Sequence, residues 1–268
     1  MSDVIRLNDG HTMPGIGIGL YKVPPEQARD VVRNALEIGY RSVDTAALYA
    51  NEEGVGQAVR DSGLAREDVF VTTKLWNDSH GYENALRAGK ECLSRLGLEY
   101  LDLLLIHWPC PARGLYFETF SAMQKLRDDG LVRSIGVSNF EPEQMDNLPE
   151  LPVVNQIELH PLFNQHELRA YNAVHGIVTT AWSPLARGRL TDVPQINAIA
   201  AEVGRTPAQV ILRWHRQLGN AVIPKSVTPS RMRENFDLDF ALTSDQMAAI
   251  GALNQNHRIG PNPMTFPG

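Results

Sequence analysis

Eight short apolar segments alternate with amphipathic ones along nearly the whole chain, and this alternation constrains the fold more than any other feature. The short segments are rich in Val, Ile and Leu, which is typical of strands buried on both faces of a parallel sheet. They span residues 14–20, 41–46, 68–75, 100–107, 132–139, 152–159, 176–184 and 220–226. Segments with apolar residues at helical spacing lie between them. Eight such units in 268 residues predict an α/β fold, the (β/α)8 TIM barrel.

The two ends of the chain add to this plan. Residues 4–14, "VIRLNDGHTMP", predict a β-hairpin, because Asn-Asp-Gly is a turn signal between two short extended pieces. We expect this hairpin to close the bottom of the barrel. Residues 254–268 are rich in Pro and Gly and lack periodicity, which indicates a loop or tail. No linker, low-complexity segment or charge run interrupts the chain, so residues 1–268 are predicted to form a single domain.

A doubly wound nucleotide-binding sheet is the alternative α/β fold. Its usual mark is G-x-G-x-x-G at the turn from the first strand to its helix. Gly15, Gly17 and Gly19 instead recur with period two, and Gly54 and Gly56 follow a helical rather than a strand pattern. Both are weak matches, so we interpret these glycines as positions of close packing in or beside a barrel.

Composition and charge exclude several classes of partner. The net charge is −6, so nothing indicates binding to nucleic acid or to an anionic membrane. The only cysteines are Cys92 and Cys110, whose spacing fits neither a disulfide framework nor a zinc site. The sequence shows no signal-peptide pattern and no run of about 18 apolar residues. We therefore expect a cytoplasmic, monomeric protein that binds a small molecule and no metal.

Ionisable side chains gather where three neighbouring strands end. Asp44 ends the second predicted strand and Tyr49 follows it in the loop, Lys74 ends the third, and His107 ends the fourth. Taken singly, each has an ordinary structural explanation, such as a capping carboxylate or a hydrogen-bonded core histidine. In barrels of this type, however, the catalytic groups stand at the carboxyl ends of the strands. Four ionisable groups at one rim therefore predict an active site.

Six ordered motifs carry a resemblance that spans nearly the whole chain. They are "DTAALYANEEGVG", "TTKLW", "LLIHWP", "IGVSNF", "NQIELHP" and "IPKSVTPSRMRENF". The sequence resembles the aldo-keto reductase superfamily, and most of all its bacterial 2,5-diketo-D-gluconate reductase group. The resemblance implies an NADPH-dependent oxidoreductase that reduces aldehydes, α-dicarbonyls and keto-sugars to alcohols. It also implies that Asp44, Tyr49, Lys74 and His107 are the catalytic residues.

Elementary acid–base chemistry agrees with these roles. Tyrosine is a poor acid near neutral pH, because its ordinary pKa is about 10. We expect the Lys74 ammonium to lower the pKa of Tyr49, and Asp44 to hold Lys74 charged and in place. Tyr49 would then donate the proton to the carbonyl oxygen. A neutral His107 would orient and polarise that carbonyl.

Aromatic and amide side chains at the rim complete the predicted site. The resemblance implies that Ser138, Asn139 and Gln156 hydrogen-bond the carboxamide of the nicotinamide, and that Trp182 stacks on its ring. Three aromatic residues are expected to wall an apolar substrate pocket: Tyr21, Trp76 and Trp108.

The end of the eighth segment has the character of a phosphate site. Lys225 and Ser226 stand at a strand tip, and Thr228 is predicted to N-cap a helix that starts with Pro229. Arg231 follows in the first turn, where a cation opposes the helix dipole unless an anion binds there. The resemblance implies that this anion is the 2′-phosphate of NADPH. It also implies the remaining cofactor contacts: Ser183, Leu185, Val227 and, at the adenine, Glu234 and Asn235.

Two loops are short for this superfamily, and other functions stay open. Segments 110–120 and 183–192 are brief, so the enclosure of the dinucleotide is in question, and Arg187 and Arg189 are candidates for contacting the pyrophosphate. One alternative is a nucleotide-binding redox sensor or regulatory subunit with negligible turnover. Another is a barrel metallo-hydrolase. The sequence does not supply the metal ligands of such an enzyme, because Asp44 and His107 alone do not make a metal site. His160 and His166 have the wrong spacing for a pair of ligands on one helix.

Overall fold

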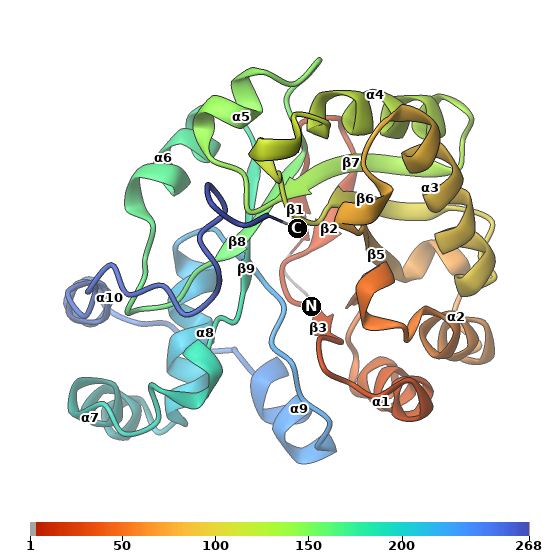
Figure 1. Cartoon of the computed structure of the whole chain (residues 1–268). Helices are drawn as coiled ribbons and strands as arrows, with labels where there is room; N and C mark the ends of the chain where they lie inside the picture. Colours follow the sequence, from red (N-terminus) through yellow and green to blue (C-terminus); the bar gives the residue numbers. More distant parts are fainter. Residues whose placement is uncertain (1–3, 268) are drawn as a thin grey trace.

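A sheet of eight parallel strands forms the centre of the protein in the computed structural model, which describes residues 4–267. The strands follow one another in the sheet in the same order as in the chain, and the sheet curls so that its helices lie outside it (Figure 1). The strands are β3 (Ile18–Gly19), β4 (Ser42–Asp44), β5 (Phe70–Leu75), β6 (Leu101–Ile106), β7 (Val132–Ser138), β8 (Val154–Glu158), β9 (Val178–Trp182) and β10 (Ala221–Val222). All eight lie inside the predicted segments, so the predicted strands are confirmed.

Backbone hydrogen bonds also join residues beside the first and last strands. The amide of Gly17 donates to the carbonyl of Val222 at 2.9 Å, and the amide of Val222 donates to Gly15 at 3.0 Å. The amide of Gly19 donates to Pro224 at 3.1 Å. A Cβ at Gly19 would lie 2.7 Å from the carbonyl oxygen of Ile223, so glycine permits this approach. The interpretation of these glycines as close-packing positions is confirmed.

Helices cover the outer face of the sheet. They are α1 (Pro25–Ile38), α2 (Glu52–Asp61), α3 (Tyr82–Leu96), α4 (Tyr116–Asp128), α5 (Pro142–Asp146), α6 (His166–Val174), α7 (Pro194–Val203), α8 (Pro207–Gln217), α9 (Pro229–Phe236) and α10 (Ser244–Gly251). Short 3₁₀ turns lie in the connections: η1 (Ala47–Tyr49), η2 (Arg66–Asp68), η3 (Asn77–Ser79), η4 (Pro111–Arg113) and η5 (Ala186–Gly188). Proline at the first helical position starts several helices, as in α1 and α8, because its missing amide is unpaired there anyway.

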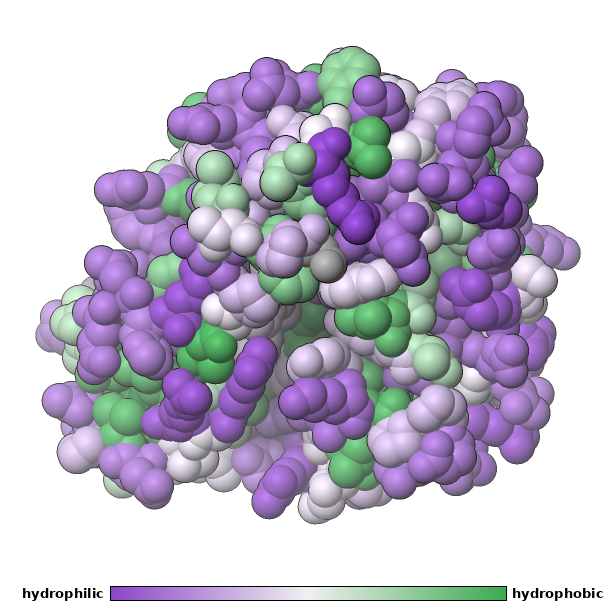
Figure 2. Space-filling view, viewed as in Figure 1, coloured by the Kyte–Doolittle hydropathy of each residue, from purple (hydrophilic) through white to green (hydrophobic). Residues whose placement is uncertain are grey.

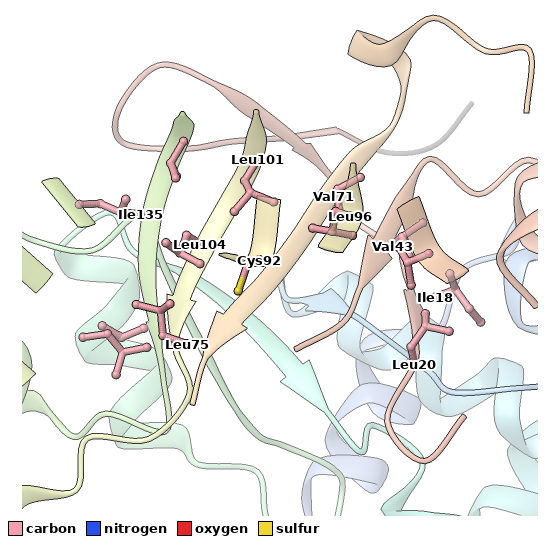
Figure 3. Close-up of a cluster of buried hydrophobic side chains, with 14 of the residues drawn as sticks. Ile18, Leu20, Val43, Val71, Leu75, Cys92, Leu96, Leu101, Leu104 and Ile135 are labelled. Atoms are coloured by element: carbon pink, nitrogen blue, oxygen red, sulfur yellow. The ribbon is translucent and has the colours of Figure 1, made fainter. Parts of the chain in front are cut away.

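Alternation along the strands divides the core into two layers. On β6, Leu104 packs toward the helices and Leu103 and Leu105 pack inside the curl of the sheet. Figure 3 shows the outer layer, in which Leu104 from a strand meets Cys92 and other side chains from α3. Both layers are mainly apolar, although some polar side chains are buried along the strands, among them Thr72, Asp102 and Ser134.

The N-terminal hairpin packs against the inner layer. Its strands β1 (Val4–Arg6) and β2 (Thr12–Pro14) pair antiparallel, as predicted. Leu7 and Met13 from this hairpin are buried in one cluster with Phe70 and the inner leucines of β6. In residues 4–267 no helix is long and apolar enough to cross a membrane.

Candidate active site

The four ionisable residues predicted as catalytic come together at the carboxyl ends of neighbouring strands. Asp44 is the last residue of β4, Lys74 lies near the end of β5, and His107 directly follows β6. Tyr49 reaches the same place from η1, the turn that follows β4. Because the strands are parallel, residues that lie far apart in the sequence share one rim.

A buried ion pair stands at the centre of this group. Lys74 Nζ contacts a carboxylate oxygen of Asp44 and donates to the carbonyl of Thr45 at 2.8 Å. Gln156 Nε2 donates to the other oxygen of Asp44 at 2.7 Å, so both carboxylate oxygens are satisfied. Burial lowers the pKa of Lys74, and the adjacent Asp44 carboxylate opposes that shift.

Tyr49 lies beside this pair. Its ring centroid is 5.3 Å from Lys74 Nζ and 5.7 Å from the His107 ring, which it meets edge-on. Burial raises the pKa of Tyr49 well above its ordinary value, and the Asp44 carboxylate adds to the rise. The expected lowering of the Tyr49 pKa does not occur, because burial disfavours a phenolate and the Asp44 carboxylate repels it. Tyr49 is therefore a neutral phenol that retains its proton at neutral pH.

His107 is neutral, as predicted. Burial lowers its pKa well below the ordinary value, and the nearby Lys74 ammonium acts in the same direction. Its Nδ1 is buried without a hydrogen-bond partner among the described residues. A proton on Nδ1 would bury an N–H without an acceptor, so the tautomer with the proton on Nε2 is favoured.

Amide and indole side chains form a chain of hydrogen bonds next to the tetrad. Trp182 Nε1 donates to Asn139 Oδ1 at 2.8 Å, and Asn139 Nδ2 donates to the carbonyl of His107 at 3.0 Å. Ser138 Oγ donates to the carbonyl of Gln156 at 2.8 Å. Asn139 has φ +64°, a left-handed conformation that asparagine tolerates better than most residues. The four residues predicted to contact the nicotinamide thus lie together: Ser138 and Trp182 end β7 and β9, Asn139 follows β7, and Gln156 is the central residue of β8.

Aromatic rings surround the tetrad. The Tyr21 ring lies 5.3 Å from that of Tyr49, and the Trp76 ring lies 5.1 Å from the imidazole of His107. Trp108 lies 6.5 Å from Trp182. The three residues predicted to wall a substrate pocket are therefore all neighbours of the tetrad or of Trp182.

A groove of about 700 Å³ extends from Tyr21 along the ends of the last strands. Figure 2 shows a hollow near the middle of this face of the molecule. Nine of the predicted cofactor contacts line it: Ser183, Leu185, Lys225, Ser226, Val227, Thr228, Arg231, Glu234 and Asn235. Sequence reasoning missed further lining residues, among them Lys22 and the start of α8 at Thr206–Pro207. The capping box of Thr206 and Gln209 marks that helix start but says nothing of its position beside the groove.

The groove is positively charged at one end. Lys225 and Arg231 are exposed, and neither forms an ion pair with a carboxylate in residues 4–267. Thr228 occupies the N-cap position of α9, as predicted, but its hydroxyl makes no capping bond. Ser226 Oγ instead accepts from the amide of Thr228 at 3.2 Å. Free cations beside a helix N-terminus are suited to binding a phosphate.

The two arginines considered for the pyrophosphate lie in different places. Arg187 is exposed and lines the groove. Arg189 does not line it and contacts His257 instead, with 3.2 Å between the nearest nitrogens. No group of three or more histidine, cysteine, aspartate or glutamate side chains in the described chain could hold a metal ion.

The C-terminal segment reaches the site, which the sequence does not reveal. Residues after α10 form no helix or strand within the described range, as predicted, and the segment runs back toward the middle of the strand ends (Figure 1). Phe266 packs on Trp108, with 4.6 Å between the ring centroids. The absence of periodicity indicates a loop but not where that loop lies.

Known proteins are similar to this chain in sequence and in fold. Residues 13–255 match the aldo/keto reductase family. An aldo-keto reductase of Mycobacterium sp. (strain KMS) is 51% identical over 98% of this chain and 97% of its own. The methylglyoxal reductase DkgA of Escherichia coli (strain K12) is 47% identical over 99% of this chain and 98% of its own.

Solved structures of similar proteins have the same fold as this chain. The crystal structure of Gox0644 in its apo form has a TM-score of 0.95 at 49% identity and covers 98% of both chains. A mutant of Gox0644 in complex with NADPH also has a TM-score of 0.95, at 48% identity over 99% of both chains. With the family matched over most of its length, relatives near half identity and the same fold, this chain belongs to the aldo/keto reductase family.

Proposed function

We propose that this protein reduces the carbonyl groups of small aldehydes, α-dicarbonyls and keto-sugars to alcohols, with NADPH as the hydride donor. One observation carries the proposal. A buried tetrad with two neutral proton-bearing groups, Tyr49 and His107, stands beside a groove whose far end holds Lys225 and Arg231, two exposed cations without a carboxylate partner among the described residues. Such a site offers proton donors at one end and a phosphate site at the other.

The relatives support both halves of the proposal. Methylglyoxal is an α-dicarbonyl, and a methylglyoxal reductase is 47% identical to this chain. Two structural neighbours are complexes with NADPH or NADP, one of them at 48% identity.

The residues of the groove fit a dinucleotide phosphate. Lys225 and Arg231 can pair with a 2′-phosphate, and Glu234 and Asn235 line the groove next to them. Trp182, Ser138, Asn139 and Gln156 do not line the groove itself. The flat ring of Trp182 lies next to Ser183, which does, and its Nε1 donates to Asn139 Oδ1. When bound, the reduced nicotinamide supplies a hydride, which no side chain can.

Tyr49 and His107 would act together on the carbonyl oxygen. The Nε2–H of neutral His107 orients and polarises the carbonyl, and the Tyr49 hydroxyl donates its proton to the oxygen as negative charge develops there. Lys74 and Asp44 form an ion pair that stays next to the phenol without removing its proton. The Trp76 ring, 5.1 Å from the imidazole of His107, would shield one side of this step from water.

We also infer that the curled sheet closes into a barrel with the hairpin across its bottom. The three backbone hydrogen bonds between residues 15–19 and 222–224 support closure. The burial of Leu7 and Met13 among inner-layer side chains supports the position of the hairpin.

A panel of carbonyl substrates tests the proposed function. NADPH oxidation is followed by absorbance with methylglyoxal, simple aldehydes and a keto-sugar, with and without a chelator. Steady oxidation that the chelator does not affect is the expected result. Tight binding of NADPH without turnover would indicate the sensor or regulatory function, and activity lost with chelator would indicate a metallo-enzyme.

A further inference from the structure

Glu158 is a buried carboxylate that the proposed chemistry does not use. It ends β8, and its side chain is 0% exposed. Its oxygens accept hydrogen bonds from the backbone amides of Ile259 and Gly260, the latter at 2.8 Å, and lie 3.1 Å from His160 Nε2. Two of its three partners are thus backbone groups of the C-terminal segment.

Gly260 lies where a larger residue does not fit. A Cβ at this position would be 2.6 Å from Cη2 of Trp182 and 2.8 Å from a Glu158 oxygen. The backbone of the segment therefore passes directly against the edge of the Trp182 ring, at the point where Glu158 holds it. The φ of Gly260 is not in the left-handed region, so its backbone conformation does not require glycine. The lack of space beside Trp182 and Glu158 does.

The same segment continues to the substrate side of the site. Beyond Gly260, Phe266 packs on Trp108, and Trp108 in turn lies 6.5 Å from Trp182. A weaker attachment precedes Gly260, where Arg258 lies 3.8 Å from Glu141 and over the ring of Phe163. The most buried point of attachment is Glu158.

We propose that Glu158 is a positioning residue: it holds the C-terminal segment against Trp182 and Trp108 and so fixes the wall of the site where the nicotinamide and the carbonyl substrate meet. The proposal rests on the proposed function for its effect on catalysis. Its mechanical part, the attachment of the segment at Ile259 and Gly260, stands on the hydrogen bonds alone.

A carboxylate is the group best suited to this task. It offers two oxygens that can accept from two successive backbone amides, and hydrogen bonds to a charged acceptor are stronger than those to a neutral one. Glu158→Gln keeps the size but offers one oxygen and places an N–H donor against a backbone amide. Gly260→Ala leaves Glu158 intact and pushes the segment away from Trp182. The two variants thus disturb one contact from opposite sides.

The experiment compares these two variants with matched controls. Glu150→Gln removes a carboxylate that pairs with Arg127 instead of with the segment, and Gly251→Ala adds a methyl where nothing lies within 4 Å. Hydrogen exchange of residues 259–266 reports the attachment, and tryptophan fluorescence reports the surroundings of Trp182. Steady-state kinetics separate kcat from KM for the carbonyl, and binding of adenosine 2′,5′-bisphosphate reports the far end of the groove.

Both test variants should exchange the amides of residues 259–266 faster and change the tryptophan emission. The KM for the carbonyl should rise, and kcat/KM should fall by up to about 100-fold, the loss that a misplacement of about 1 Å can cause. Binding of the adenosine bisphosphate should not change, and the controls should match wild type. A loss of folded protein alone would lower kcat and leave KM unchanged.

Two results would overturn the proposal. Unchanged exchange in Glu158→Gln would show that Glu158 does not hold the segment. Faster exchange with unchanged KM and emission would show that the segment does not position the site. If the wild-type protein oxidises no NADPH with any carbonyl, the proposed function fails, and the exchange and fluorescence results still decide whether Glu158 holds the segment against Trp182.

Discussion

Tyr49 keeps its proton because its surroundings leave no place for a phenolate. The ring is buried, and the nearest carboxylate, Asp44, repels negative charge. His107 stays neutral for the same kind of reason, since burial and Lys74 both disfavour an imidazolium. At the scale of single residues, the site therefore presents two neutral donors, an O–H and an N–H, side by side. Such a pair suits an oxygen that becomes negative only during the reaction.

The variant Arg231→Ala tests whether NADPH binding in the groove requires this positive charge. NADPH carries a phosphate that NADH lacks, and a hydrogen bond to a charged group contributes roughly 1.5–3 kcal/mol. Arg231→Ala should therefore weaken NADPH binding by about one to two decades and leave NADH affinity nearly unchanged. Both dissociation constants can be measured by tryptophan quenching at low and high salt, and salt should weaken NADPH binding more in wild type than in the variant. An equal loss for both cofactors would assign Arg231 a structural role.

At the scale of strands and helices, buried apolar runs were enough to predict the sheet. All eight strands lie in predicted segments, because a strand covered on both faces is apolar along its length. The tetrad was equally predictable, since parallel strands bring their carboxyl ends to one rim. The contact of the C-terminal segment with Trp182 and Trp108 was not, because Pro- and Gly-rich sequence indicates a loop without indicating its neighbours. The rise in the pKa of Tyr49 could not be predicted, because the sequence places a lysine near the tyrosine without showing how deeply the phenol is buried.

The variant Gly19→Ala tests the close contact between the first and last strands of the sheet. An added Cβ would lie 2.7 Å from the backbone carbonyl of Ile223, which cannot move without disturbing the hydrogen bonds beside it. Gly19→Ala should reduce the free energy of unfolding by about 1–3 kcal/mol, the usual cost of overpacking. Urea unfolding followed by tryptophan fluorescence measures it, with Gly251→Ala as the control in open space. Equal stability of wild type and Gly19→Ala would contradict the close approach.

At the scale of the whole molecule, buried histidines link stability to pH. Burial lowers the pKa of His80 to about 4 and that of His215 to about 3, and it lowers that of His107 as well. The unfolded chain binds a proton at each of these positions below a pH of about 6.5, whereas the folded protein does not. Stability is therefore lost as the pH falls below that value.

Between pH 6.5 and 5, each buried histidine should cost on the order of 1 kcal/mol of unfolding free energy per pH unit. His80→Gln removes one titrating group and should make this dependence shallower. His166→Gln is the control, because His166 is exposed. Urea denaturation at several pH values measures the slope. An identical slope in wild type and His80→Gln would show that His80 is not held neutral by the fold.

The most direct test of the proposed function is Tyr49→Phe, which removes one oxygen and its proton from the site. The measurement is NADPH oxidation with methylglyoxal, together with the NADPH dissociation constant of the same protein. General acid catalysis contributes about 10²–10⁴-fold. The kcat should therefore fall by a factor in this range or larger, while NADPH affinity stays at the wild-type value. Trp76→Phe, which keeps an aromatic wall, should retain far more of the rate. A folded Tyr49→Phe variant that kept more than about a tenth of the wild-type kcat would contradict the assignment of Tyr49 as the proton donor.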